Sequence, residues 1–271
     1  MNDTSDIIVE RELGKGTFGT VYRGHRKGDS TPLAIKVVSK KDHSETRLKR
    51  AMKEISILKQ LGCHHKNVQC LKDVFETPTA IMMLSEYIPG ESLAIYRASL
   101  DSKQEILRSL DLVYQLVDGL EYIHQKNIVH RDIKPENIMI HNPIPVYIDF
   151  DLACFYDMCG DGKIGTPYYM APEVWLAAVN DWKMADVYSL GATLFYVFNN
   201  HKRPYNIRDI ERLEQAIVSS IIPSPESHSG FEPLDKLIQT MIEKLPGDRP
   251  HLSSVKETVQ MMIKSVMQSD I

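Results

Sequence analysis

Short apolar or alternating runs, separated by glycine, aspartate and proline, fill the first third of the chain. Runs of this length and spacing are typical of β-strands. One stretch differs, because apolar residues recur at steps of three and four over residues 47–61, which predicts an amphipathic helix. The predicted strands are residues 7–13, 20–26, 32–39, 68–75 and 80–87.

After residue 87 the apolar spacing becomes mostly helical. Residues 185–199 are apolar nearly all round, which predicts a buried helix. The other helices are expected at residues 106–124, 208–219, 234–243 and 251–266. A small β-rich part is thus followed by a larger helical part. We expect an α+β protein with two lobes that meet near residues 86–90.

The composition is that of an ordinary globular protein, with 271 residues of which 43% are hydrophobic and 25% charged. A net charge of −4 is too small to indicate a nucleic-acid partner or a membrane surface. No apolar run reaches the roughly 18–20 residues that a membrane-spanning helix needs. The first residues are polar and the second is Asn2, so we expect neither a signal peptide nor N-myristoylation.

The four cysteines show no Cys-x-x-Cys spacing and complete no zinc pattern with histidines. They are Cys63, Cys70, Cys154 and Cys159. We expect them to be free thiols in a reducing compartment. Together with the polar first residues, this predicts a soluble intracellular protein, either cytoplasmic or nuclear.

Three glycines, Gly14, Gly16 and Gly19, lie close together between two predicted strands. Glycine allows the backbone to come close to phosphate oxygens with its N–H groups exposed. A plain hairpin with glycine turns would have a similar sequence. No helix pattern follows the glycines at once, which disfavours a dinucleotide-binding fold.

Lys36 stands in the apolar strand predicted at residues 32–39. Its ammonium must face either solvent or a buried anion. The next helix carries Glu54, which could pair with Lys36 and aim the ammonium at a phosphate group.

Three longer motifs follow. Residues 130–137 read His-Arg-Asp-Ile-Lys-Pro-Glu-Asn, residues 148–150 read Ile-Asp-Phe, and residues 165–173 read Gly-Thr-Pro-Tyr-Tyr-Met-Ala-Pro-Glu. Together with the glycines and Lys36, these motifs stand in the order that is typical of eukaryotic protein kinases. The chain resembles that family over about residues 7–265, and its serine/threonine branch in particular.

The resemblance implies a bilobal kinase fold in a single catalytic domain over residues 1–271. Its N-lobe would span about residues 7–86, its hinge about 86–90 and its C-lobe about 91–265. The resemblance also implies ATP as the phosphoryl donor, Mg²⁺ as the cofactor and protein substrates. We expect the catalytic domain to be a monomer.

The resemblance also assigns the catalytic roles. Asp132 would accept or orient the proton of the substrate hydroxyl, and Lys134 would contact the γ-phosphate. Lys36, fixed by Glu54, would hold the α- and β-phosphates. The magnesium ligands would be Asn137 and Asp149.

ATP would lie between the lobes, with the three glycines over its phosphates. The backbone of Glu86 and Ile88 would pair with the adenine edge, and Ser85 takes the gatekeeper position behind it. A small gatekeeper opens space there unless Met82 and Met83 fill it. The adenine would be sandwiched between Leu13, Val21, Ala34 and Met139.

Lys134 and Thr166 match the serine/threonine branch, because tyrosine kinases have an Arg/Ala pattern in the catalytic loop. Thr166 is therefore counted with the catalytic residues. Two further matches concern the scaffold. Glu173 resembles the partner of Arg249 in a buried ion pair, and Asp186 resembles the residue that anchors the catalytic loop.

One position departs from the family, whose Asp-Phe-Gly triplet reads Asp149-Phe150-Asp151 here. The added carboxylate could alter metal affinity or stiffen the loop, or it could be inert because aspartate tolerates unusual backbone angles. Two alternatives stay open. A pseudokinase would bind ATP without turnover, and only this change favours it. A small-molecule phosphotransferase would not need residues 165–173.

The segment from residue 149 to residue 173 contains no serine. Its hydroxyl residues are Tyr156, Thr166, Tyr168 and Tyr169. In many relatives, the arginine that Arg131 matches receives a phosphorylated residue of this loop. We expect activity without loop phosphate, either because Asp157 or Asp161 gives Arg131 a permanent carboxylate or because the loop orders by packing.

Overall fold

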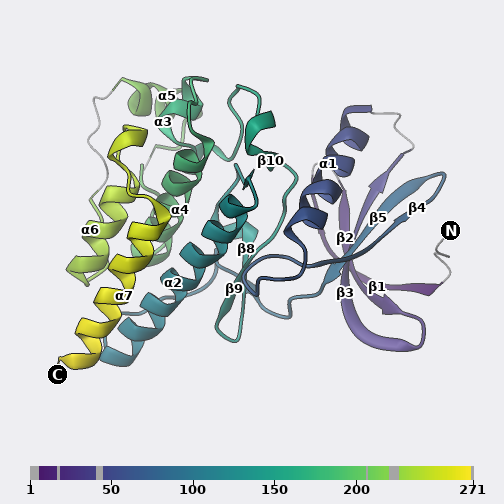
Figure 1. Ribbon diagram of the computed structural model, residues 1–271, viewed down its shortest axis with the longest axis horizontal. Helices are drawn as coiled ribbons and strands as arrows, with labels where there is room; N and C mark the ends of the chain where they lie inside the picture. Colours follow the sequence, from purple (N-terminus) through teal and green to yellow (C-terminus); the bar gives the residue numbers. More distant parts are fainter. Residues whose placement is uncertain (1–5, 17–18, 41–44, 206, 220–225, 270–271) are drawn as a thin grey trace.

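The computed structural model describes residues 6–16, 19–40, 45–205, 207–219 and 226–269. The chain folds into a β-rich N-lobe, at the right of Figure 1, and a helical C-lobe, at the left. This arrangement confirms the expected bilobal α+β fold. The domain limits stay a prediction.

The N-lobe is built on a five-stranded antiparallel sheet in the order β1-β2-β3-β5-β4. Its strands are β1 (Ile7–Lys15), β2 (Thr20–Arg26), β3 (Asp29–Ser39), β4 (Leu71–Glu76) and β5 (Ala80–Glu86). Four of them agree closely with the predicted strands. The predicted strand at residues 68–75 begins too early, because Val68 instead forms an isolated bridge with Tyr147 of the other lobe.

Helix α1 (Glu45–Leu61) packs against both lobes. Its Ala51 and Ile55 lie in a cluster with residues of β3 and β5, whereas Leu58 and Leu61 belong to the main core cluster with the C-lobe. Met52, which the spacing places on the apolar face, is exposed. The other positions of the predicted apolar stripe are buried or half-buried, so Met52 alone departs from it. The contacts with both clusters fix α1 relative to both halves of the cleft.

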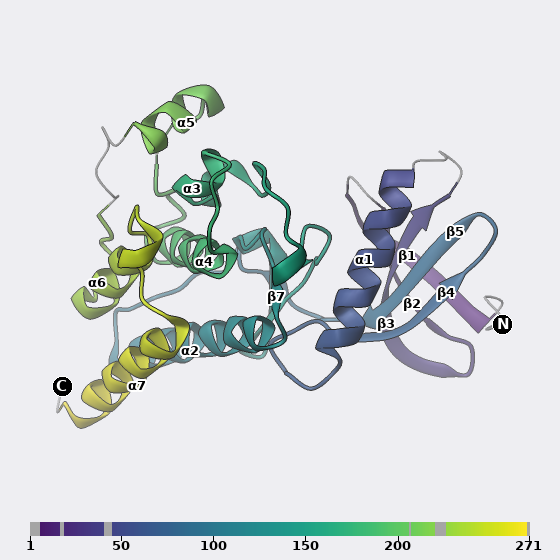
Figure 2. The same ribbon diagram turned by 45° about the horizontal axis from the view of Figure 1, so that its top comes forward.

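The C-lobe contains the remaining helices, and they confirm the helices predicted after residue 87 to within a few residues. They are α2 (Lys103–Gln125), α3 (Pro172–Trp175), α4 (Trp182–Phe198), α5 (Ile210–Val218), α6 (Glu232–Met241) and α7 (Leu252–Gln268). Short 3₁₀ turns lie at Pro135–Asn137, Tyr156–Met158, Pro167–Tyr169 and Pro246–Asp248. α2 and α7 lie side by side in both views (Figures 1 and 2).

Two small sheets carry the loops that face the N-lobe. The first has the order β6-β8-β9, and the second pairs β10 with β7. Their strands are β6 (Glu91–Ser92), β7 (Ile128–Val129), β8 (Ile138–His141), β9 (Ile144–Tyr147) and β10 (Cys154–Phe155). Both sheets lie at the edge of the C-lobe that carries the sequence motifs.

Helix α4 passes through the middle of the C-lobe and is almost entirely buried, as its all-round apolar sequence predicts. Asp181 caps its first turn by accepting hydrogen bonds from the N–H groups of Lys183 and Met184. Gly191 lies so close to α6 that a Cβ there would be 2.7 Å from the Cβ of Met241. A close-packed helix therefore supports the loops above it.

The expectation of free thiols is wrong. Cys63 is joined to Cys70, and Cys154 is joined to Cys159, by disulfides with Cα–Cα distances of 4.7 and 5.5 Å. Each pair is close in sequence and lies across a turn, so cysteines can meet without a Cys-x-x-Cys spacing. The argument from free thiols to a reducing compartment no longer applies.

No helix in the part of the chain that the structure describes is long and apolar enough to cross a membrane.

Candidate active site

Lys36 and Glu54 form the ion pair that their positions on β3 and α1 predict. The Lys36 ammonium lies 2.8 Å from Oε1 and 2.9 Å from Oε2 of Glu54. Glu54 is buried, with 2% of its side chain exposed. An ammonium held by both oxygens of a buried carboxylate has a fixed position in the cleft.

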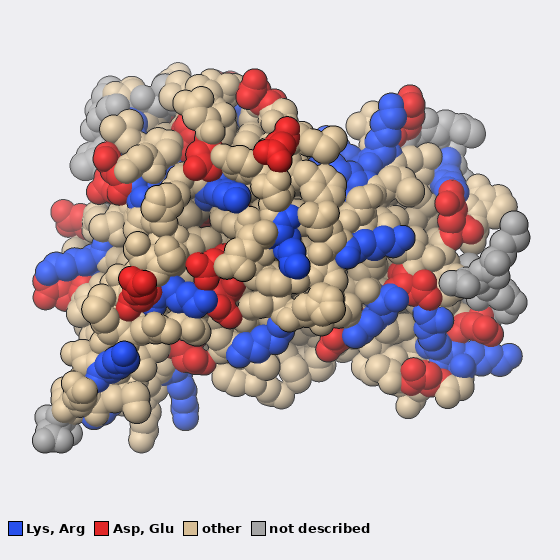
Figure 3. All heavy atoms as spheres, viewed as in Figure 1, with Lys and Arg blue, Asp and Glu red and all other residues tan. Residues whose placement is uncertain are grey.

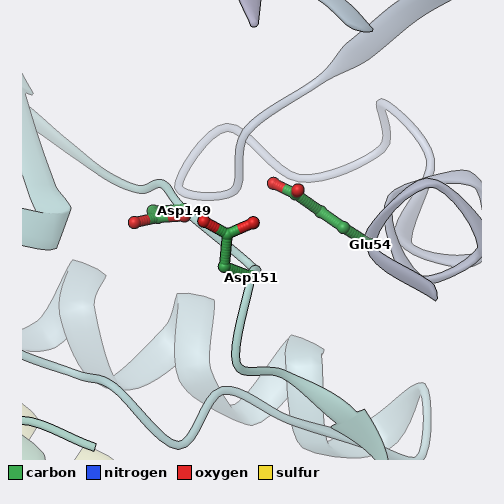
Figure 4. A group of neighbouring side chains, drawn as sticks. All are labelled: Glu54, Asp149 and Asp151. Atoms are coloured by element: carbon green, nitrogen blue, oxygen red, sulfur yellow. The ribbon is translucent and has the colours of Figure 1, made fainter. Parts of the chain in front are cut away.

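Two more carboxylates approach the same ammonium. Asp151 Oδ1 lies 2.7 Å from Lys36 Nζ, and Asp149 Oδ1 lies 3.4 Å from it. Figure 4 shows the side chains of Glu54, Asp149 and Asp151 converging from α1 and from the loop after β9. Oxygen atoms of these three side chains all lie within 4.8 Å of one another. The structure thus brings Asp151 into the site, where the sequence left its role open.

The ammonium of Lys36 and the three carboxylates around it shift one another's pKa values. Burial alone would lower the pKa of Lys36, but Glu54, Asp149 and Asp151 outweigh it and raise that pKa. Burial raises the pKa of Glu54 to about 8, against the opposing charge of Lys36. It also raises the pKa of Asp149. For Asp151 burial acts in the same direction, but the Lys36 charge and the hydrogen bonds from its neighbours together outweigh burial and lower the pKa. The cluster holds more acid groups than one ammonium neutralises, which suits a further cation.

The backbone at Asp151 does not need glycine. Asp149 has a φ of 62°, whereas Asp151 is not among the residues with positive φ. An L-residue therefore fits at this position without strain. The family's glycine is replaceable here, and the side chain that replaces it points at Lys36.

The catalytic-loop residues form one hydrogen-bond network. Lys134 Nζ lies 2.8 Å from Asp132 Oδ2 and donates to the Thr166 hydroxyl at 2.8 Å. Thr166 in turn donates to Asp132 Oδ1 at 2.6 Å. Asn137 Nδ2 donates to the second oxygen of Asp132 at 3.0 Å. The structure therefore brings together all four of these predicted residues around the Asp132 carboxylate.

Asp186, near the start of α4, anchors the catalytic loop through hydrogen bonds to its backbone. Its carboxylate accepts hydrogen bonds from the N–H groups of His130 at 2.8 Å and Arg131 at 2.9 Å. It also lies 2.9 Å from His124 Nε2. Arg131 has a φ of 63°, a conformation that a residue with a Cβ rarely adopts. The buried Asp186 carboxylate offsets that strain, as its resemblance to an anchoring residue implies.

Phe150 is fully buried and packs against the His130 ring, with ring centroids 4.8 Å apart. It belongs to the same core cluster as Leu58 of α1. The packing holds α1 against the C-lobe while Asp149 faces Lys36. The cleft therefore contains both the Lys36–Glu54 ion pair and the candidate metal ligand Asp149.

The three glycines lie near the end of β1 and in the turn between β1 and β2. Gly16 N–H donates to the carbonyl of Gly19 at 2.9 Å. A Cβ at Gly19 would lie 2.7 Å from the Val37 carbonyl oxygen, so only glycine fits. Gly14 is opposite Val21 in the strand register. Thr17 and Phe18, which the sequence places at the tip, lie outside the described residues.

The residues expected around adenine lie on five strands and the hinge. Ala34 of β3 is directly opposite Ser85 of β5, and Leu13 and Met139 lie on β1 and β8. The backbone N–H of Glu86 donates a hydrogen bond to the carbonyl of Cys70 at 3.1 Å. This arrangement does not test the roles of Leu13, Val21, Ala34, Ser85, Glu86, Ile88 and Met139 in ATP binding, which stay predictions.

The Ser85 hydroxyl has a polar partner, whereas Met82 and Met83 belong to apolar clusters. Met83 is buried in the cluster between the sheet and α1, and Met82 packs in the cluster that contains Leu33. Gln69 Nε2 donates to the Ser85 hydroxyl at 2.9 Å. Sequence reasoning missed Gln69. The available signal was one amide side chain inside the apolar run at residues 68–75.

Glu173 and Arg249 form a buried, two-point ion pair. Arg249 Nη1 lies 2.6 Å from Glu173 Oε1, and Nη2 lies 2.8 Å from Oε2. The guanidinium also donates to the carbonyls of Met184, Glu243 and Lys244. The pair confirms the sequence expectation and ties helix α3 to the loop before α7.

The hypothesis that Asp157 supplies a carboxylate to Arg131 is wrong. Asp157 accepts a hydrogen bond from Asn127 Nδ2 at 2.7 Å. Arg131 Nε donates to the carbonyl of Leu152 at 2.7 Å, and its guanidinium lies over the Trp182 ring at 5.1 Å. The loop at this point orders by hydrogen bonding and packing.

The sequence model of the protein kinase domain matches residues 7–261. The chain belongs to the protein kinase family. A protein of Acanthamoeba polyphaga mimivirus that is named as a serine/threonine-protein kinase is 35% identical in an alignment of 237 positions, which covers 83% of each chain. CBL-interacting protein kinase 28 of Oryza sativa subsp. japonica is 30% identical over 93% of this chain. The RAF proto-oncogene serine/threonine-protein kinase of Xenopus laevis is 26% identical over 97% of it.

The match covers only 58% of the rice protein kinase and 42% of the Xenopus one, so this kinase domain spans about half of those two relatives. Membership of the protein kinase family makes the chain a phosphotransferase. The family uses ATP and typically Mg²⁺.

The side chains fit such a metal. Asn137 keeps its amide nitrogen on Asp132, which leaves the amide oxygen available, and the Asp149 carboxylate is 41% exposed to the cleft. Amide and carboxylate oxygens are the ligands that Mg²⁺ prefers.

Proposed function

We propose that this chain is a serine/threonine-protein kinase, which transfers the γ-phosphoryl group of ATP to serine or threonine hydroxyls of other proteins. The observation that carries the proposal is the contact of Lys134 and Thr166 with the two oxygens of Asp132. Those two residue types distinguish the serine/threonine branch, and here they touch the same carboxylate.

In this proposal the substrate hydroxyl displaces Thr166 from Asp132 Oδ1 and gives its proton to that carboxylate. The hydroxyl oxygen bonds to the γ-phosphorus as the bond to the bridging oxygen of ADP breaks. Lys134 lies 2.8 Å from Asp132 and offsets the negative charge on the transferring group. The protein contributes mainly position and positive charge.

ATP would be held from both lobes. Lys36, fixed by Glu54, would bind the α- and β-phosphates, and the turn that carries Gly14, Gly16 and Gly19 would cover them. Mg²⁺, held by Asn137 and Asp149, would neutralise phosphate charge. The adenine would lie at the hinge against Ser85, Glu86, Ile88 and the apolar residues Leu13, Val21, Ala34 and Met139.

Protein substrates are supported by the segment over residues 165–173, which a small-molecule phosphotransferase would not need. Two residues of this segment are fixed to the C-lobe. Thr166 is held by its hydrogen bond to Asp132. Tyr169 is buried, and its carbonyl accepts a hydrogen bond from the Ser189 hydroxyl. Acidic and basic side chains are interspersed on the face in Figure 3, without a field of one sign. We infer a peptide site rather than a nucleic-acid site. The expected monomer stays a prediction.

The test is transfer of labelled phosphate from ATP to a generic basic protein, followed by identification of the labelled residue. We expect phosphoserine or phosphothreonine. Asp132→Asn should lower the rate by about 10²–10⁴-fold while ATP still binds. ATP binding without any transfer by the unaltered chain would mean a pseudokinase, and transfer to tyrosine alone would contradict the assigned branch.

A further inference from the structure

Gln69 lies just before β4, and the function proposed above gives it no role. Its backbone N–H donates to the carbonyl of Tyr147 at 3.0 Å. The preceding residue, Val68, bridges the same Tyr147. These contacts fix the main chain of Gln69 beside the end of β9, where the metal-binding loop begins.

The Gln69 side chain joins two site residues that are far apart in the sequence. Its Nε2 lies 2.9 Å from the Ser85 hydroxyl, and its Oε1 lies 3.2 Å from the backbone nitrogen of Asp149. A backbone N–H can only donate, so the atom that faces Asp149 must be the amide oxygen. The amide nitrogen then faces Ser85, whose hydroxyl accepts. Hydrogen-bond chemistry therefore fixes the orientation of the amide.

Asp149 stands in a conformation that needs support. Its φ of 62° lies in the left-handed region, which is unfavourable for a residue with a Cβ. On its N-terminal side, Ile148 N–H donates to the Asn137 carbonyl at 2.9 Å. The N–H of Asp149 itself is held by Gln69.

Ser85 makes this arrangement possible. It is buried, with 2% exposed, and it is short enough to leave room for an amide beside it. Its hydroxyl supplies the acceptor that the amide nitrogen needs, because an unpaired buried N–H would be costly. The small side chain of Ser85 and the amide of Gln69 are thus complementary.

We infer that Gln69 is a positioning residue, which holds the metal-binding loop at Asp149 and closes the space behind the adenine at Ser85. One side chain thereby links the gatekeeper to the phosphate end of the cleft. The inference rests on the proposed function for the place of the adenine in front of Ser85 and for the role of Asp149 as a metal ligand.

Three variants separate the two hydrogen bonds. Gln69→Leu removes both at similar volume. Gln69→Glu keeps an oxygen acceptor for Asp149 but loses the amide donor. Ser85→Ala removes only the bond to the gatekeeper.

The first measurement is hydrogen exchange of the Asp149 amide in protein without nucleotide or metal. Exchange should be about tenfold faster in Gln69→Leu and within about threefold of the unaltered protein in Gln69→Glu. Ser85→Ala should lie between them. Equal exchange in Gln69→Leu and the unaltered protein would overturn the inference, as would Gln69→Glu behaving like Gln69→Leu. If Gln69→Leu does not fold, Gln69→Met takes its place.

The second measurement is calorimetric binding of ADP with and without Mg²⁺. For Gln69→Leu we expect affinity for ADP alone within about twofold of the unaltered protein, and an additional affinity from Mg²⁺ that is about fivefold smaller. Equal loss with and without Mg²⁺ would indicate a general structural defect and would contradict positioning.

Neither measurement needs phosphate transfer. Suppose that amide exchange and ADP binding change as expected but the unaltered chain phosphorylates no protein. The positioning role of Gln69 would then stand, and the proposed function would be refuted. Transfer by a chain in which Gln69→Leu changes neither exchange nor metal-dependent binding would refute only the role of Gln69.

Discussion

The Asp151 carboxylate lies 2.7 Å from the Lys36 ammonium, which is as close as the carboxylate of Glu54 at 2.8 Å. Lys36 is therefore shared between the family's usual partner and a residue that replaces the family's glycine. Nucleotide phosphates that approach Lys36 must share it with Asp151 or displace that carboxylate.

Replacing Asp151 with glycine should raise the Mg²⁺ concentration needed for half-maximal rate, by roughly fivefold. The reason is that the variant removes a negative charge beside the candidate metal ligand Asp149. Rates measured across a magnesium titration at saturating ATP test this. Asp151→Asn is the matched control, because it removes the charge and keeps the shape. An unchanged requirement in both variants would show that Lys36 already neutralises this carboxylate.

The binding of ATP-site inhibitors that carry a large aryl group directed at Ser85 should change in opposite directions when Ser85 and Gln69 are substituted. Ser85→Phe should weaken them by tenfold or more, about 1.4 kcal/mol. Gln69→Ala should strengthen them by a similar factor, because the amide that occupies the space beside Ser85 is removed. Inhibition constants for an aryl-bearing compound and its smaller parent give the comparison. The idea fails if the parent compound shows the same changes.

Loss of Glu173 should destabilise the fold strongly. Glu173→Ala leaves the Arg249 guanidinium, which is 0% exposed, without its carboxylate. We expect a loss of about 3–5 kcal/mol in the free energy of unfolding, measured by urea denaturation. Glu232→Ala breaks an exposed pair with Lys236 and should cost less than about 0.5 kcal/mol. Similar losses in the two variants would contradict this account of the buried pair.

Activity should not depend on phosphate in residues 149–173. The loop is already held by the pairing of β10 with β7 and by the bond from Arg131 to Leu152. Phosphatase-treated enzyme, shown by mass spectrometry to lack phosphate there, should keep its rate within about tenfold.

Two residues sharpen that test. Asp161 is exposed, so Asp161→Asn should leave the rate of the phosphate-free enzyme nearly unchanged. Phosphate on Tyr156 should lower the rate of the enzyme. The Tyr156 hydroxyl lies 3.4 Å from Asp181, the N-cap of α4, so a phosphate there would repel that carboxylate. A rate that falls more than tenfold on dephosphorylation and returns with loop phosphate would refute the prediction.

The contact between α2 and α7 should weaken in acid. Lys256 lies 2.5 Å from Asp118, which is also 3.1 Å from His65. Partial burial would raise the pKa of Asp118, but the bonds and charges of Lys256 and His65 outweigh it and lower that pKa. The stabilisation is therefore present above the ordinary pKa of aspartate and is lost as pH falls through the lower folded value.

Accordingly, Asp118→Asn should cost about 1 kcal/mol or less at pH 7, and the difference from the unaltered protein should shrink near pH 3. Urea denaturation at the two pH values measures it. A cost that is constant between pH 7 and pH 3 would mean that Asp118 acts by packing and not by charge.

Most of the site was predictable because its residues lie in contiguous motifs. Asp132, Lys134 and Asn137 share one loop, so their order in the chain already places them near one another. The ion pair of Lys36 with Glu54 joins two elements, but the strand and the helix that carry them have clear periodicities.

The features that escaped prediction depend on contacts between distant segments. Gln69 meets Ser85 and Asp149 only because residues before β4 run beside β9. The direction of the Asp151 side chain depends on where α1 places Glu54. The disulfides depend on the turns that bring cysteines seven and five residues apart into contact, and spacing alone does not encode those turns.

The dependence of the catalytic loop on Asp186 has a thermal consequence. Asp186 is part of α4, whose Gly191 packs directly on α6. On heating, enzymatic activity should therefore disappear when α4 loosens, whether or not the β-sheet of the other lobe is still intact. Thermal inactivation would report the melting of one helix in the C-lobe.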